Sequence, residues 1–475
     1  MIIINNIISK VALKFIMFIY LLSSLGFVLL DVTLSLYIFP VNCFLIIVIC
    51  SLGKWVDIRI GLLFFTSIYY VGQYLNFFIL NSDDISSGLS DRIIIFNLND
   101  YYTNIEALSH VVVFQVGVLV QFISQEFSFN EKYYLYRYKN IIDSKYVDLI
   151  KFGKWPIIFL LILFTLQLDW ELIKYKYTLG GMSEVFFLCY LLFTISTMDF
   201  IYRIYSGRLI NYLHVFWLMF FLIIFNYLGV RQVLFWSACI LFFGFSSFYS
   251  IKNCNTLGFL DNKKSFFIVI LCALSFLMVL NIGFLFRHQK MEMLNVLANL
   301  SFSQIFSSTL SGFFAETKLT TYNLLAVINE NNNGNTLRFL ESFRDFFVML
   351  IPSGLWREKY QYLEVINFSK EHNVTPFGTW YIVGFFSSLV VHPFYLFITS
   401  YIYSFFIYAV SVKIFSQHRP LVFASTLYGV AYSFLGLYVV RGTLFGGVKI
   451  ALSIMCSLFI LNVGIRILKN GSKYI

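Results

Sequence analysis

The sequence predicts an all-α polytopic membrane protein, and two observations support this fold class. Hydrophobic residues make up 59% of the 475-residue chain and charged residues only 12%, whereas soluble domains carry about 25% charged residues. The apolar residues also form long continuous runs instead of the short alternating segments of a β-barrel. Because backbone polar groups find no water inside a bilayer, each run is expected to form a helix of roughly 20 residues.

Twelve apolar runs are expected to span the membrane. They lie near residues 11–30, 34–52, 60–80, 106–124, 155–170, 183–202, 210–229, 232–250, 265–284, 394–412, 421–440 and 447–465. The first run is long and lacks a small-residue cleavage site, so we interpret it as a retained signal anchor. The expected organisation is therefore nine spans with short loops in residues 1–285, a large external loop in 286–392, and three spans with the C-terminus in 393–475.

The basic residues indicate how the spans are oriented. The net charge is +10, which on a soluble protein could suggest a nucleic-acid partner. Here most lysines and arginines of the short loops fall on the side of the two termini, as the positive-inside rule describes. We therefore expect both termini in the cytoplasm, a bacterial-type inner (cytoplasmic) membrane with the large loop in the periplasm, and no nucleic-acid binding.

The external loop at 286–392 is too long for a simple connection and is therefore expected to be functional or disordered. Its tryptophan, phenylalanine and leucine content favours short helices over the membrane face. Residues 377–392, just before Pro393, are apolar but short, which predicts a re-entrant or surface-lying helix. A full span there would move the basic C-terminus outside, against the charge rule.

Two arginines lie in tight external turns, where cations are normally avoided. Arg231 follows Leu228-Gly229-Val230, and Arg441 precedes Gly442-Thr443. The planar guanidinium matches phosphate oxygens, so a shared anion site beside the large loop is one interpretation. The alternative for each is contact with lipid headgroups or with the C-terminus of a helix.

The large loop supplies the remaining candidates. Glu316 follows an apolar stretch and could accept a proton from a sugar hydroxyl, or it could be a surface residue paired with Lys318. Arg338 and Arg344 lie on one helical face with two acidic neighbours, which favours a salt-bridged helix over a substrate site.

A turn rich in Pro and Gly follows in the same loop, and it ends near Trp356. Arg357 and Lys359 stand beside this tryptophan. No metal site or cofactor is expected, because the histidines are isolated and none of the seven cysteines has Cys-x-x-Cys spacing.

Four short stretches look familiar: 229–231, 314–316, 351–356 with Lys359, and 441–442. In these stretches, and in its layout of about twelve spans with one late external loop, the chain resembles the Wzy-type O-antigen polymerases, which are also called oligosaccharide repeat-unit polymerases. Some members carry loop motifs of Arg, ten residues and Gly. No arginine here has a glycine at that spacing, so roles assigned through that motif do not carry over.

The resemblance implies a metal-independent glycosyltransferase of the GT-C-like, lipid-carrier-dependent kind. Its donor and acceptor would be oligosaccharides on undecaprenyl pyrophosphate, and a chain-length regulator protein would be a possible partner. Arg231, Arg441, Arg357 and Arg344 would hold the pyrophosphate, and Glu316 would be the base. Lys359 and Arg338 would support them.

Two other functions stay open at this point. A flippase for lipid-linked repeat units also has about twelve spans, but a transporter needs polar groups facing a central cavity and often has internal repeats. These spans carry few charges, and no repeat is visible. An O-antigen ligase would share the topology and the donor and differ in its acceptor, which the sequence does not distinguish.

Overall fold

The computed structural model describes the chain in blocks separated by gaps. The described residues are 2–52, 54–79, 101–125, 144–166, 182–206, 231–252, 320–321, 323–330, 344–345, 347–348, 351, 362–364, 367, 381–388, 392–416 and 420–471. Within these blocks every regular element is helical and no strand occurs. The all-α fold class is therefore confirmed for the described part of the chain.

The main helices agree with the expected apolar runs. They are α1 (Ile2–Leu30), α2 (Ser35–Ser51), α3 (Ile58–Ile79), α4 (Tyr101–Ser124), α6 (Ser144–Phe152), α7 (Lys154–Leu166), α9 (Met182–Tyr205), α11 (Arg231–Lys252), α17 (Ile382–Ser388), α18 (Pro393–Ser416), α19 (Leu421–Ala431), α20 (Val439–Arg441) and α21 (Leu444–Gly471). A π-helix, η6 (Tyr432–Tyr438), joins α19 to α20. The expected spans at 210–229 and 265–284 lie outside the described residues, and each of the others overlaps a helix.

Seven of the described helical segments are long and apolar enough to cross a membrane. They are Val11–Leu30, Val32–Ser51, Ile105–Ser124, Val185–Tyr205, Pro393–Phe415, Leu421–Tyr438 and Leu444–Leu468. Two shorter apolar helical segments, Ile58–Val71 and Phe235–Ile251, accompany them. The chain is thus a membrane protein with several spanning helices, and the full count of twelve stays a prediction.

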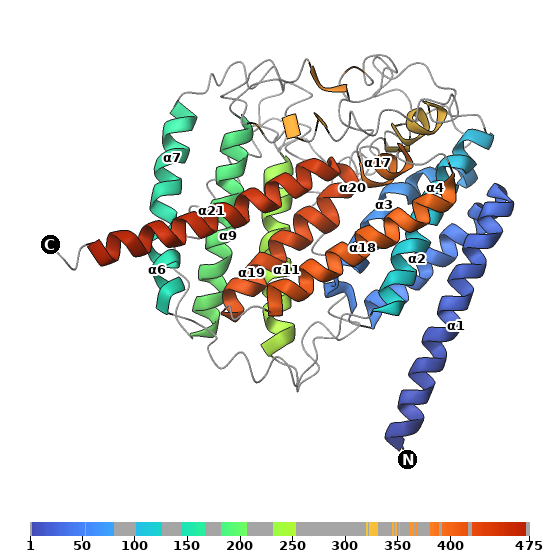
Figure 1. Ribbon diagram of the computed structural model, residues 1–475, viewed down its shortest axis with the longest axis horizontal. Helices are drawn as coiled ribbons and strands as arrows, with labels where there is room; N and C mark the ends of the chain where they lie inside the picture. The colour runs from blue at the N-terminus through green and yellow to red at the C-terminus, as the bar shows by residue number, and fades with distance from the viewer. Residues whose placement is uncertain are drawn as a thin grey trace, which may run out of the picture.

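The bundle is built around α4 and around the pair formed by α11 and α19 (Figure 1). The α4 helix is buried along almost its whole apolar length and is flanked by α1, α2, α3 and α18. By contrast, α1 lies at the edge of the bundle and exposes most of its apolar side chains. A helix that is apolar on all sides is stable in the interior of a membrane protein, and an exposed apolar face suits contact with lipid.

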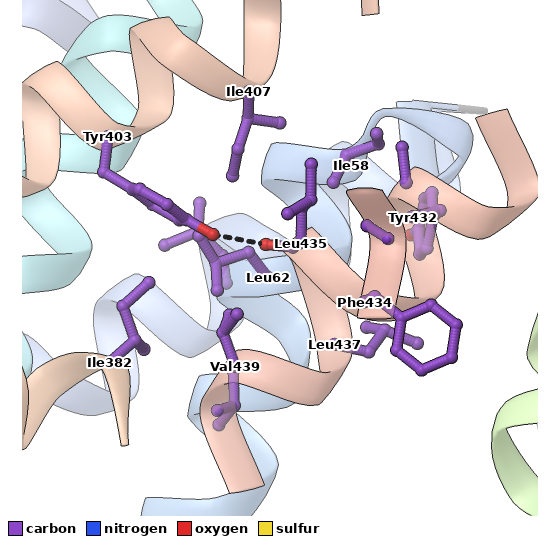
Figure 2. Close-up of a cluster of buried hydrophobic side chains, with 14 of the residues drawn as sticks. Ile58, Leu62, Ile382, Tyr403, Ile407, Tyr432, Phe434, Leu435, Leu437 and Val439 are labelled. Carbon is purple, nitrogen blue, oxygen red and sulfur yellow. Dashed lines mark hydrogen bonds between the residues drawn. The ribbon is translucent and has the colours of Figure 1, made fainter. Parts of the chain in front are cut away.

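A buried apolar cluster forms where α3, α17, α18 and η6 meet (Figure 2). It joins Ile58 and Leu62 of α3 to Ile382 of α17, together with residues of α18 and η6. The α17 helix has only seven residues, far fewer than a span needs. Six of them are buried, so this short piece of the segment 286–392 lies among the helices of the bundle.

Close packing between α11 and α19 depends on a glycine. A Cβ atom on Gly429 would lie 2.5 Å from the carbonyl oxygen of Ile240 and 2.7 Å from the amide nitrogen of Gly244. Both contacts are with backbone atoms, so the helices themselves would have to move apart. Small residues at such interfaces let helix backbones approach closely and gain dispersion contacts.

Gly429→Ala is therefore expected to destabilise the protein by about 1–3 kcal/mol, the usual cost of overpacking. The measurement is the unfolding midpoint of the purified protein in detergent. Gly464→Ala is the matched control, because it is also helical and a Cβ there has no neighbour within 4 Å. Equal midpoints for the two variants would contradict the close packing of α11 on α19.

Candidate functional site

The structure describes the backbone of the two arginines predicted from external turns. Arg231 is the first residue of α11, and Arg441 is the last residue of α20. The side chain of Arg344 is also described. The other four candidates, Glu316, Arg338, Arg357 and Lys359, lie outside the described residues, and their roles stay predictions.

The segments that carry Arg231 and Arg441 run antiparallel. Gly429 faces Ile240, whereas Tyr438, farther along the same segment, packs edge-to-face on Trp236 with ring centroids 5.3 Å apart. As the residue number rises on one segment, it falls on its neighbour. The segment from α19 to α20 therefore follows α11 in the opposite direction over its length.

This register brings the two arginine positions to the same end of the helix pair. Arg231 lies five residues before Trp236, and Arg441 lies three residues after Tyr438. Both therefore continue past the ring contact in the same direction by about one turn. Two arginine positions far apart in the sequence therefore lie at the same end of this helix pair, as a shared anion site requires.

The chain breaks its helix immediately after Arg441. Gly442 is extended, with φ −102° and ψ 175°, and α21 begins two residues later. The Thr443 hydroxyl oxygen accepts a hydrogen bond from the Gly446 amide at 2.8 Å and so caps the new helix. A Cβ on Gly442 would overlap the ring of Tyr438. This junction sets the amides at the start of α21, which favour anions, beside the Arg441 position.

A second irregular feature precedes Arg441. The π-helix η6 ends three residues before it, and π-turns are rare and frequently occur at functional sites. The hydroxyl of Tyr403 on α18 donates a hydrogen bond to the Leu435 carbonyl oxygen within η6 at 2.8 Å (Figure 2). This π-helix was not predicted from the sequence, because it leaves no periodic pattern of apolar residues.

The short helix α17 is attached to the neighbouring α4 through polar and aromatic contacts. His110 Nδ1 lies 2.9 Å from the Ser387 hydroxyl oxygen, and both residues are buried. Phe114 and Phe386 stack one turn away, with ring centroids 6.4 Å apart. A histidine inside an apolar helix is a polar group that needs a partner, and here Ser387 of α17 supplies it.

Arg344 is engaged by groups of its own loop. Its Nη2 lies 3.2 Å from Oδ1 of the buried Asp345 and donates to the Tyr362 carbonyl oxygen at 3.3 Å. More than half of its side chain is exposed. This pair joins adjacent residues, so it does not test the expected salt-bridged helix, and an anionic ligand would have to share the guanidinium with Asp345.

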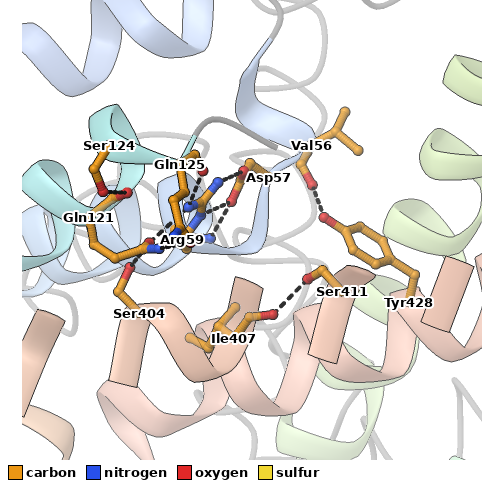
Figure 3. A network of polar contacts seen from close by, with 10 residues as sticks. All are labelled: Val56, Asp57, Arg59, Gln121, Ser124, Gln125, Ser404, Ile407, Ser411 and Tyr428. Atoms are coloured by element: carbon orange, nitrogen blue, oxygen red, sulfur yellow. Dashed lines mark hydrogen bonds and ion pairs between the residues drawn. The ribbon is translucent and has the colours of Figure 1, made fainter. Parts of the chain in front are cut away.

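A buried charged cluster that sequence reasoning missed lies at the beginning of α3 (Figure 3). The Arg59 guanidinium is fully buried and contacts both carboxylate oxygens of Asp57, at 2.9 and 2.6 Å. Its Nη1 donates to Gln121 Oε1 and to the Gln125 carbonyl oxygen, each at 2.8 Å. The Ser404 hydroxyl also donates to Gln121 Oε1, at 2.9 Å. The cluster therefore joins α3, α4 and α18.

A second buried ion pair joins α7 to α9. Lys154 Nζ lies 2.6 Å from Asp199 Oδ2, and Arg203 Nε lies 3.0 Å from Asp199 Oδ1. Asp199 lies within an apolar span, where a lone carboxylate is costly unless it is paired. Lys154 and Arg203 compensate the charge of Asp199. We therefore interpret this ion pair as a contact that stabilises the packing of α7 on α9.

The described residues contain no group of three or more His, Cys, Asp or Glu side chains placed to hold a metal ion. No protein-family model, curated protein or solved structure matches the chain. The candidate site is therefore defined by its own geometry: two arginine positions at one end of the α11 and α20 pair, a capped helix break and the π-helix that precedes it.

Proposed function

We propose that the protein polymerises oligosaccharide repeat units carried on undecaprenyl pyrophosphate into O-antigen or a related surface polysaccharide. The observation that carries the proposal is the register that places Arg231 and Arg441 at the same end of the α11 and α20 pair. Two guanidinium groups at one end of a bundle suit a pyrophosphate, which is a dianionic or more highly charged group with several acceptor oxygens. The resemblance to the Wzy-type polymerases adds the substrate class.

In this proposal the reaction is a glycosyl transfer. A hydroxyl oxygen of the acceptor's terminal sugar forms a bond to the anomeric carbon of the donor glycan. The bond from that carbon to the pyrophosphate oxygen breaks, and undecaprenyl pyrophosphate leaves with the electron pair. Arg231 and Arg441, with Arg357 and Arg344, stabilise the charge that the leaving group gains, and Lys359 and Arg338 support them. Glu316 accepts the hydroxyl proton.

The proposed setting is the periplasmic face of a bacterial inner membrane. The chain has twelve spans in this account, with both termini in the cytoplasm and a GT-C-like arrangement around the lipid carrier. The support is the charge distribution of the loops and the position of the external loop, which contributes α17 to the bundle beside α20. No metal or cofactor takes part, and a chain-length regulator is the proposed protein partner.

The test is a gel of surface lipopolysaccharide from the source strain after deletion of the gene. We expect core carrying a single repeat unit and no ladder, because units are still exported and ligated but not joined. Core without any repeat unit would contradict polymerisation and favour a flippase or a ligase. Polymer retained on the lipid carrier would then identify the ligase.

A further inference from the structure

The position of Arg441 depends on the π-helix that precedes it. In a π-helix the hydrogen bonds run over five residues instead of four, so the turn holds one residue more than an α-turn. Successive α-helical residues differ by about 100° in direction. If the π-turn shifts to another position in the sequence, the residues between its old and new positions rotate about the helix axis, and their side chains point to a different side of the helix. Arg441 lies three residues after η6 ends and one residue before the chain breaks at Gly442.

One hydrogen bond attaches this π-helix to a different helix. Tyr403 of α18 and Leu435 of η6 are both buried, at 7% and 4% exposure, and the hydroxyl-to-carbonyl distance is 2.8 Å. The surrounding side chains in Figure 2 are apolar, including Ile58 and Leu62 of α3. Where no water can replace either partner, loss of the donor leaves a buried carbonyl oxygen with fewer hydrogen bonds.

A ring contact extends this attachment to α11. Tyr438, the last residue of η6, packs on Trp236 of α11. The π-helix is thus held on one side by α18 through a hydrogen bond and on the other by the helix that begins with Arg231.

We propose that Tyr403 is a positioning residue: its hydroxyl fixes the π-turn at Leu435 and so sets Arg441 opposite Arg231. The effect of Tyr403 on the reaction rests on the proposed function. Tyr403 itself contacts neither substrate nor the reacting atoms in this account. It acts through the placement of Arg441.

The kinetic test compares Tyr403→Phe with Tyr401→Phe in the purified, reconstituted protein. Tyr401 lies on the same helix, and no hydrogen bond from its hydroxyl is found among the described residues. We expect Tyr403→Phe to lower kcat for the lipid-linked donor about fivefold, the size expected for one net hydrogen bond, with KM changed less than about twofold, because Arg441 acts on the charge of the leaving group. Tyr401→Phe should match the unsubstituted protein.

A double variant separates positioning from general damage. Arg441→Lys keeps the charge and loses the planar fork. If Tyr403 acts through Arg441, adding Tyr403→Phe to Arg441→Lys should leave kcat within about twofold of Arg441→Lys alone. Multiplied effects, or unchanged kinetics in Tyr403→Phe, would overturn the inference. An inactive unsubstituted protein would instead count against the proposed function.

A measurement independent of activity tests the geometry itself. Spin labels are attached to cysteines introduced at 231 and 441 in a chain whose native cysteines are replaced, and the distance distribution is recorded in lipid nanodiscs. We expect one narrow distribution for this chain and for the same chain with Tyr401→Phe, and a shifted or broadened one with Tyr403→Phe. Identical distributions in all three chains would overturn the inference whatever the protein catalyses.

Discussion

Arg231→Ala is expected to abolish polymer formation while the protein still inserts into the membrane. Removing one preorganised group that stabilises a developing oxyanion typically lowers kcat by about 10²–10³-fold. A guanidinium on a leaving pyrophosphate has the same role, so the ladder of long chains should disappear. Arg231→Lys should retain part of the activity, because the charge remains and the bidentate geometry is lost.

The control for this variant is Arg466→Ala. Arg466 is an exposed arginine in the last part of α21, far along the chain from the helix break at Gly442. The gel of surface lipopolysaccharide from a complemented deletion strain is the readout, with an immunoblot of membranes to verify equal amounts. A normal chain-length distribution in Arg231→Ala would remove this arginine from the site.

Asp57→Asn is expected to produce the largest loss of stability. The substitution removes the carboxylate charge from Arg59, whose side chain is 1% exposed. Breaking a buried ion pair by removing one partner costs about 3–5 kcal/mol, because the other charge stays buried without compensation. Other contacts of the guanidinium offset only part of this cost. They are the hydrogen bonds to Gln121 Oε1 and to the Gln125 carbonyl oxygen, and the rings of Phe122 and Tyr408, whose centroids each lie 5.0 Å from the guanidinium carbon.

The unfolding midpoint in detergent measures this effect. Asp31→Asn is the matched control: Asp31 is an exposed aspartate between α1 and α2 that caps a turn through Thr33, and asparagine caps equally well, so the midpoint should change little. Adding Arg59→Met to Asp57→Asn should recover most of the loss, because an apolar side chain needs no counter-charge. If Asp57→Asn unfolds at the same midpoint as Asp31→Asn, the cluster in Figure 3 does not stabilise the bundle.

The helices could be predicted from the sequence because long apolar runs have few alternatives in a membrane. Pro393, for example, starts α18, where the missing amide of proline is tolerated. The ends of α11 and α20 at Arg231 and Arg441 were also foreseeable, since Arg441 adjoins Gly442 and Arg231 lies two residues after Gly229, each in a short turn between apolar runs. For such positions local residue chemistry is sufficient.

The contacts that join distant segments could not be predicted in the same way. The sequence did not mark Arg59 as a buried residue, because its partner Gln121 lies 62 residues away along the chain. The aspartate at 199 could have been noticed as a lone acid in a span, but its partner Lys154 lies 45 residues away. The π-helix has no periodic signature, so Tyr403 could not be linked to Leu435 before the fold was known.

The most direct test of the proposed polymerisation uses the purified protein alone in liposomes with an undecaprenyl-pyrophosphate-linked repeat unit. The products are separated by glycan length, and released undecaprenyl pyrophosphate is quantified. We expect lipid-linked chains of two or more units, one released carrier for each bond formed, and neither product with Arg231→Ala. Recovery of only the single-unit substrate after incubation with the unsubstituted protein would contradict the proposed polymerisation.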